Sequence, residues 1–281
     1  MDSPQWGTRL SLPATRLASA LAARRATGSL GFIPYLTAGF PSLTATIDCA
    51  LALAGCGADA IELGVPFSDP IADGPAIQRA SHEAVLAGTS LAQVLEVART
   101  IRAQSAVPLV LMSYVNPILA YGATRFAPAA ADAGVDGVLL SDLPPEEEPL
   151  LWESLAARHL ARIHLVAPTT PPARRRELAA LSTGFVYVLS RLGVTGGAAA
   201  FSADLPTLLT DVRAAAQAPI AVGFGISRPD HITDALREAD AIIVGSALVQ
   251  VIDAARHAPA AAVREWCAGF CPALGRKDVA A

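Results

Sequence analysis

Eight short apolar runs, separated by longer segments with a helical pattern of Ala, Leu and Arg, divide the chain. Runs of this kind, alternating with helical segments, are typical of βα units around a parallel sheet. Because eight βα units close into a barrel, the chain is predicted to adopt an α/β fold, a single (β/α)8 or TIM barrel. The predicted strands are residues 32–37, 58–63, 108–112, 137–141, 163–167, 185–190, 220–223 and 241–245.

The length of 281 residues fits one such barrel, since this fold typically takes about 250 residues in a single domain. Residues 15–26, rich in Leu, Ala and Arg, predict an additional N-terminal helix before the first strand. Residues 1–13 predict an extra N-terminal arm, to which no function is assigned. The expected organisation is therefore an arm over 1–13 followed by one barrel domain over 14–281.

Composition excludes several classes of partner. The net charge of −4, with acidic and basic residues mixed along the chain, gives no electrostatic footprint for nucleic acid. Even the apolar stretch 241–252 is interrupted by Gly245, Ser246 and Gln250, so it falls short of the roughly 18 residues of a membrane span. The N-terminus also lacks the apolar core of a signal peptide. The chain is therefore expected to be cytoplasmic, without a nucleic-acid or membrane partner.

The numbers and spacing of lysine, histidine and cysteine residues limit which reactions and metal sites the chain can support. Lys277, in the polar tail, is the single lysine, so no barrel lysine is available for covalent aldolase or pyridoxal chemistry. The five histidines form no HxH or HxxxH pair, and no metal site is expected. The four cysteines lack paired CxxC spacing and are expected to be buried free thiols: Cys49, Cys56, Cys267 and Cys271.

Glu62 is the first candidate catalytic residue, because barrel enzymes place their chemistry where the strands end. It alternates with Ile61 and Leu63, so it points into the barrel mouth if those two face the helices. A carboxyl that is partly desolvated there has a raised pKa, which suits it to proton transfer. The alternative is a structural glutamate paired with a buried arginine.

The segment that follows, residues 65–75, contains three prolines, two aspartates and a glycine, and this composition predicts a shaped loop. Asp73 is the second candidate catalytic residue. It also precedes Gly74 and Pro75 at a plausible helix start, where an aspartate is a favoured cap. Residue context alone leaves both roles open.

Three glycine-rich turns follow the sixth, seventh and eighth predicted strands, at residues 190–197, 223–227 and 244–247. In this fold the loops after strands 7 and 8, with a helix N-terminus, form a recurring phosphate site in which backbone N–H groups meet the anion. The three turns together predict a phosphate site. Tight turns without a ligand are the alternative.

Residues 57–78, GADAIELGVPFSDPIADGPAIQ, closely resemble the signature of the tryptophan synthase α chain family. The motifs FIPYLTAGFPS, LMSYVNP, SRLGVTG, GFGIS and IVGSALV follow in that family's order, over about residues 28–255. The resemblance implies a lyase that splits indole-3-glycerol phosphate into indole and glyceraldehyde 3-phosphate for L-tryptophan biosynthesis. It also implies a β subunit that carries pyridoxal phosphate in an α2β2 complex, and no cofactor on this chain.

The resemblance assigns roles to individual residues. The catalytic residues are Glu62 and Asp73. The implied substrate-binding residues are Tyr35, Leu111, Tyr187, Thr195, Gly196, Phe224, Gly225, Gly245 and Ser246. The implied partner-interface residues are Pro66, Phe67, Asp69 and Pro70. One departure lies at residues 197–200, Gly-Ala-Ala-Ala, which are less polar than is typical of the lid loop that contains Thr195.

These assignments predict a retro-aldol reaction without a Schiff base or a metal. Glu62 is expected to exchange protons with indole C3 and the adjacent hydroxyl, and ionised Asp73 to accept the ring N–H. Three alternatives remain: a stand-alone lyase that releases free indole for secondary metabolism, a catalytically silent regulatory barrel, and another phosphosugar enzyme such as an isomerase.

Overall fold

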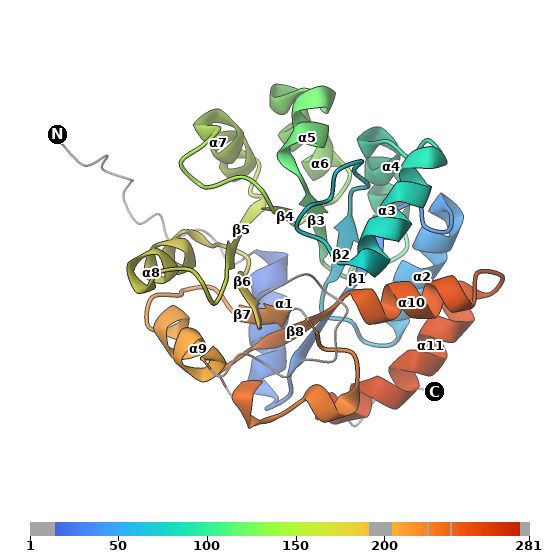
Figure 1. The fold of residues 1–281 in the computed structure, drawn as a ribbon. Coiled ribbons are helices and arrows are strands. Elements are labelled where there is room, and N and C mark those ends of the chain that lie inside the picture. Colours follow the sequence, from blue (N-terminus) through green and yellow to red (C-terminus); the bar gives the residue numbers. More distant parts are fainter. Residues whose placement is uncertain (1–14, 191–203, 224, 237, 276–281) are drawn as a thin grey trace.

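The structure, a computed structural model, describes residues 15–190, 204–223, 225–236 and 238–275. Eight parallel strands form a closed barrel in chain order, with β8 beside β1 (Figure 1). The predicted closed (β/α)8 barrel is therefore confirmed. The predicted arm over residues 1–13 lies outside the described residues. The strands are β1 (Gly31–Thr37), β2 (Ile61–Gly64), β3 (Leu109–Ser113), β4 (Gly137–Leu140), β5 (Ala161–Val166), β6 (Val186–Leu189), β7 (Ile220–Gly223) and β8 (Ala241–Val244).

Helices surround the barrel and close one end of it (Figure 1). Three of them begin at a hydroxyl cap, since Thr15, Ser42 and Ser90 accept backbone N–H groups of their first turns. The helices are α1 (Arg16–Ala26), α2 (Leu43–Gly55), α3 (Pro75–Leu86), α4 (Leu91–Arg102), α5 (Val115–Tyr121), α6 (Ala123–Asp132), α7 (Pro149–Ala157), α8 (Pro172–Leu181), α9 (Leu205–Arg213), α10 (Ser246–Ala254) and α11 (Pro259–Phe270), with short 3-10 helices η1 (Pro229–His231), η2 (Asp234–Leu236) and η3 (Cys271–Leu274).

Alternate residues of each strand face the barrel interior or the helices, as the pleat of a strand requires. The helix-facing side chains belong to one large cluster that includes Ile61, Leu63 and Leu111. The interior has a smaller cluster of its own. Its strand residues include Ile33, Val110, Leu139, Ile163, Tyr187, Ala221 and Ile243, with Met112, Leu165 and Leu189 packed against them.

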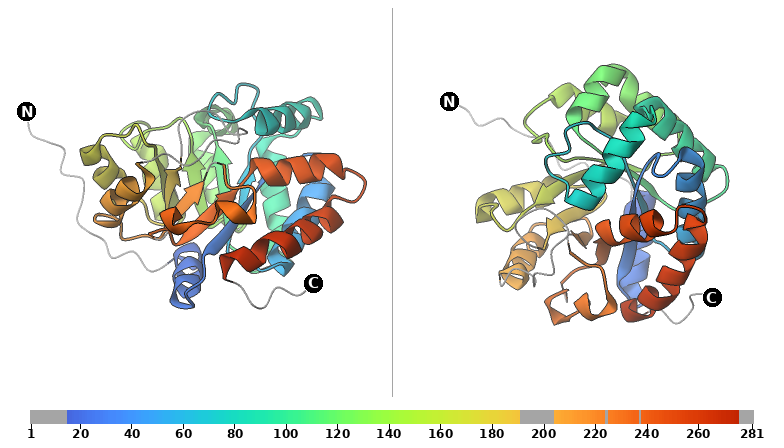
Figure 2. Two further views of the ribbon diagram at one scale, coloured as in Figure 1. Left: turned by 60° about the horizontal axis from the view of Figure 1, so that its bottom comes forward. Right: turned by 45° about the vertical axis from the view of Figure 1, so that its right-hand side comes forward.

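The predicted N-terminal helix is present as α1, and it covers the barrel end opposite α3 (Figure 2, left, blue and teal). Its Leu17 and Leu21 are fully buried and belong to the interior cluster. Helix α1 is therefore an apolar plug for the end of the barrel where the strands begin.

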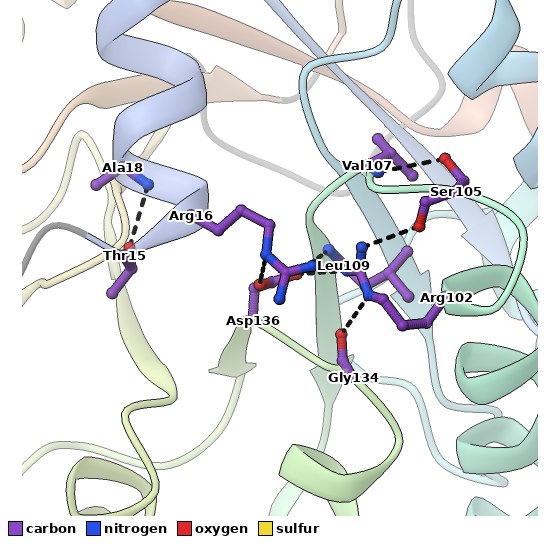
Figure 3. A network of polar contacts seen from close by, with 9 residues as sticks. All are labelled: Thr15, Arg16, Ala18, Arg102, Ser105, Val107, Leu109, Gly134 and Asp136. Carbon is purple, nitrogen blue, oxygen red and sulfur yellow. Dashed lines mark hydrogen bonds and ion pairs between the residues drawn. The ribbon is translucent and has the colours of Figure 1, made fainter.

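Arginines of α1 and of two barrel helices surround this plug with ion pairs. Each pair involves a buried aspartate that lies just before a strand and also accepts a backbone N–H of the preceding strand. Figure 3 shows one of them, Asp136, which pairs with Arg16 and Arg102 and accepts the N–H of Leu109. The other two aspartates are Asp59, paired with Arg24, and Asp240, paired with Arg25 and Arg213.

Two other predictions from composition can be compared with the structure. All four cysteines are buried thiols outside any disulfide, as predicted, and they come from α2, α11 and the residues that directly follow these helices. Among the described residues no single helix has the length and apolar character to cross a membrane, although α3 and α4, bent by 103°, pass that test together.

Candidate active site

Glu62 lies in the second position of β2, in register with Tyr35 of β1 and Val110 of β3. Paired residues of neighbouring strands share a face of the sheet, so Glu62 points into the barrel interior with Val110. Its side chain is 1% exposed, and Oε1 has no hydrogen-bond partner. No arginine among the described residues pairs with Glu62, so the described part of the chain gives no support to the alternative of a structural ion pair.

Asp73 is the next-to-last residue of the β2–α3 loop (residues 65–74) and is 6% exposed. Its Oδ2 accepts a hydrogen bond of 3.1 Å from the hydroxyl of Tyr114. The residue that caps α3 is Gly74, and no side chain bonds to the first turn of that helix. The capping alternative for Asp73 is therefore wrong, which leaves its carboxylate free for another role.

The two carboxyls have different pKa values. Burial raises the pKa of Glu62 to about 8, and the nearby charge of Asp73 adds to this rise. Burial raises the pKa of Asp73 to about 6, and the hydrogen bond from Tyr114 opposes the rise. Near pH 7, Glu62 is therefore mostly protonated while Asp73 is mostly ionised, a division that suits an acid and an anion in one site.

Two tyrosines lie close to Glu62. Tyr35 on β1 and Tyr187 on β6 are both buried, and burial raises the pKa of each phenol, so both remain neutral. Each phenol fills the space beside a glycine of the next strand. A Cβ on Gly64 would lie 2.1 Å from the Tyr35 hydroxyl, and a Cβ on Gly223 would lie 2.4 Å from that of Tyr187. The glycines therefore make room for the tyrosines at the barrel mouth.

Of the residues implied to contact indole, the structure places Tyr35 and Tyr187 beside the carboxyls. It places Leu111 elsewhere: this side chain is in register with Leu63 and Val138 and packs in the helix-facing cluster. The assignment of Leu111 to the substrate site therefore needs correction, because the neighbouring Met112 lies on the same face of β3 as Val110 and packs against the interior cluster. Phe224 lies outside the described residues.

The implied phosphate-binding residues lie where β7 and β8 end. Gly225 has a φ of +88°, a conformation that favours glycine. Gly245 is the N-cap of α10, and a Cβ there would meet no atom closer than 3.5 Å, from Ile77. Ser246 begins α10, and its buried hydroxyl has no hydrogen-bond partner. Thr195 and Gly196 lie outside the described residues.

The implied interface residues of the β2–α3 loop differ in exposure. Asp69 is exposed and Pro70 is half-buried, whereas Pro66 is buried. Phe67 is half-buried because its ring packs on that of Tyr114, with 5.1 Å between centroids. Pro66 is therefore not exposed to a partner, and the exposed large hydrophobic side chain of this loop is Ile71, at 79%.

Two residues of this site were missed from the sequence, Met112 and Tyr114. Both lie in the motif LMSYVNP, of which only Leu111 was selected. The alternation that oriented Glu62 also applies to β3: with Leu111 facing the helices, residues 110, 112 and 114 share the opposite side. The described residues contain no group of three His, Cys, Asp or Glu side chains arranged to hold a metal ion.

Comparison with known proteins gives the same fold and family. The sequence model of the family described as "Tryptophan synthase alpha chain" matches residues 21–270. The tryptophan synthase alpha chain of Solibacter usitatus is 48% identical over 244 residues, which are 87% of this chain and 91% of that relative. That of Chloroflexus aurantiacus is 45% identical over 240 residues, 85% of this chain and 90% of the relative.

Solved structures of tryptophan synthase alpha subunits have the same fold as this chain. The tryptophan synthase subunit alpha of Legionella pneumophila has a TM-score of 0.83 at 33% identity, covering 94% of this chain and 99% of that one. A structure of Mycobacterium tuberculosis tryptophan synthase has a TM-score of 0.83 at 36% identity, covering 92% and 99%. From the matched length, the identities and the shared barrel, the chain belongs to the tryptophan synthase alpha chain family.

Proposed function

We propose that Glu62 and Asp73 are the catalytic residues of this chain, and that it cleaves indole-3-glycerol phosphate to indole and D-glyceraldehyde 3-phosphate. The observation that carries the proposal is a pair of buried carboxyls of unequal pKa in the mouth of a barrel. Carboxyls in such surroundings are suited to proton transfer and to stabilising a developing cation.

The reaction needs a proton on indole C3 and the removal of a proton from the adjacent hydroxyl. Protonated Glu62 donates to C3, which places positive charge on the ring nitrogen, and ionised Asp73 accepts the N–H and stabilises that charge. The bond between C3 and the glycerol carbon then breaks as the hydroxyl loses its proton to the Glu62 carboxylate. The products are indole and the aldehyde, and Glu62 is protonated again.

The residues around the two carboxyls bind the indole ring and the phosphate of the substrate. Tyr35, Met112, Tyr187 and Phe224 contact the indole ring, with Met112 in place of Leu111. The phosphate lies at the N-terminus of α10, where unpaired N–H groups and the helix dipole favour an anion. The residues proposed to hold it are Gly225, Gly245 and Ser246, with Thr195 and Gly196 on the lid loop.

The partner in this proposal is a tryptophan synthase β subunit, which carries the pyridoxal phosphate and forms an α2β2 complex in the cytoplasm. Residues 14–281 act as one lyase domain, and the arm over 1–13 has no assigned role. Relatives at 42 to 48% identity that are all named tryptophan synthase alpha chain favour this biosynthetic subunit over a stand-alone lyase. Asp69 and Ile71 are the exposed loop residues proposed to contact the partner.

The test is indole formation from indole-3-glycerol phosphate by the purified chain, with and without a β subunit. Glu62→Gln keeps the shape of the side chain but removes its exchangeable acid, so turnover should fall by about 10² to 10⁴. Glu96→Gln, the same change at an exposed position of α4, is the matched control and should retain activity. Near-normal indole production by Glu62→Gln would overturn the proposed mechanism.

A further inference from the structure

Tyr114 joins the end of β3 to the β2–α3 loop. It is buried and is the N-cap residue of α5. Its backbone is held on both sides, because the Ser113 hydroxyl donates to the Tyr114 carbonyl at 2.7 Å and the Val115 N–H donates to Asp142 Oδ1 at 2.8 Å. The backbone that carries the phenol is therefore held by groups outside the loop that the phenol contacts.

Three contacts connect this side chain to the loop. The hydroxyl accepts the N–H of Ala72 at 2.9 Å and donates to Asp73 Oδ2 at 3.1 Å. The ring packs on Phe67, with 5.1 Å between centroids. One side chain therefore contacts the loop near its start and at its catalytic end.

The chemistry of these groups fixes the direction of the bond to Asp73. A backbone N–H only donates, so the Tyr114 oxygen accepts from Ala72, and its single proton is left for Asp73. An ionised carboxylate only accepts, and hydrogen bonds to a charged group are stronger than those between neutral groups. The arrangement is therefore complementary to ionised Asp73.

We propose that Tyr114 is a positioning residue for the lyase reaction, whose hydroxyl fixes the Asp73 carboxylate in the orientation that meets the indole N–H. The inference rests on the proposed function and adds a residue that the family resemblance did not assign. Tyr114 acts through Asp73.

The groups around Asp73 determine how the loss of this bond would change its ionisation. They are Glu62 from β2, Tyr35 from β1 and Tyr187 from β6, together with Tyr114 itself. Burial raises the pKa of Asp73, and the Tyr114 hydrogen bond is the interaction that lowers it; no positive charge of the described residues contributes. Without the hydroxyl, the pKa of Asp73 should therefore rise.

The test variant is Tyr114→Phe, which keeps the ring contact with Phe67 and removes only the hydroxyl. We expect kcat to fall about tenfold while KM changes less than about threefold, because a bond to a charged group is lost at the reacting end of the substrate. The acidic limb of the kcat profile should move up by about one pH unit. A purely structural role would leave the position of that limb unchanged.

Carbon-13 NMR of the Asp73 carboxyl, without substrate, should show the same upward change in pKa, so this measurement stays informative even if the wild-type chain has no lyase activity. Tyr121→Phe, at the end of α5 where the ring lies under Arg125, is the matched control and should change neither kcat nor the pKa. An active wild type with an unshifted Asp73 pKa and an unshifted pH profile in Tyr114→Phe would overturn the inference. Wild-type chain without indole formation would instead overturn the proposed function.

Discussion

Ionisation of Glu62 opposes folding, because its carboxyl is fully buried and one of its oxygens has no hydrogen-bond partner. The group proposed to transfer protons therefore lowers the stability of the barrel at neutral and alkaline pH. A position of this kind is one where the sequence favours chemistry over stability.

Glu62→Gln should accordingly stabilise the protein in a pH-dependent way. The folded-state pKa of about 8 lies above the ordinary value of 4.5, so the contribution of Glu62 to stability is complete below 4.5 and is lost as the pH rises to about 8. Above pH 8 we expect the free energy of unfolding of the variant to exceed that of the wild type by about 1 to 3 kcal/mol, with little difference at pH 4. Denaturant unfolding at the two pH values measures this difference. A difference that did not vary with pH would contradict the raised pKa.

Gly245→Val should separate substrate affinity from folding. A Cβ at this position meets ordinary contact distances, and the φ of Gly245 is not in the left-handed region, so the variant should fold. If the phosphate lies against this backbone, the added side chain occupies its space and KM should rise by about tenfold or more. Steady-state kinetics with circular dichroism measure both properties, and an unchanged KM would place the phosphate elsewhere.

Alternation along β2 was sufficient to orient Glu62 from the sequence, because a strand has only two faces and Ile61 and Leu63 occupy one of them. The same rule was not applied to β3, and Leu111 was selected where Met112 faces inward. The role of Asp73 could not be decided in this way. It depends on the path of an irregular loop and on Tyr114, which comes 41 residues later in the chain.

At the scale of elements, all eight strands were predicted, and their ends were the least accurate part. The second was expected over 58–63, whereas β2 is Ile61–Gly64. Ala58 and Ala60 extend the apolar pattern of the strand, yet residues 58–60 only lead into it, because the Asp59 carboxylate accepts the N–H of Phe32 and pairs with Arg24. Such a contact between distant segments cannot be read from local hydrophobicity.

The ion pairs between α1 and the barrel should matter far more than those on the surface. Asp240 is 2% exposed, pairs with Arg25 and Arg213, and accepts the N–H of Ile220 at 2.7 Å. Asp240→Ala leaves these groups without their acceptor and should lower the free energy of unfolding by roughly 3 to 5 kcal/mol. Asp253→Ala, in a partly exposed network between α3 and α10, should lower it by less than about 1 kcal/mol.

Denaturant unfolding of both variants measures this contrast. If Asp240→Ala does not fold, Asp240→Asn retains a hydrogen-bonding oxygen and should still be less stable than the Asp253 variant. Equal effects at the two positions would show that α1 does not depend on these pairs to close the barrel.

For the whole molecule, the two ends of the barrel have separate tasks. The end where the strands begin is closed by α1 with its leucines and its arginine–aspartate pairs. The end where they finish contains the carboxyls, the tyrosines and the β2–α3 loop. Stability and chemistry can therefore change independently along the barrel axis, as is general for this fold.

Ile71 connects this division to the proposed partner. It is 79% exposed and lies two residues before Asp73, in a loop whose other large apolar side chains are at least half-buried. A partner that covers Ile71 would bury an exposed apolar side chain and would contact the loop that contains Asp73, the carboxylate proposed to be catalytic, only two residues further along the chain. Ile71→Ser should therefore leave the lyase rate of the isolated chain unchanged.

Its effect should emerge only with a β subunit. In a titration of indole formation against the β subunit, Ile71→Ser should need about tenfold more partner for half-maximal stimulation, the loss expected when a well-buried aliphatic contact is removed from an interface. Leu86→Ser, an equally apolar and 74% exposed position at the far end of α3, is the matched control. Normal stimulation of Ile71→Ser would mean that the partner docks away from this loop, whereas a lower rate without partner would mean that Ile71 supports Asp73 directly.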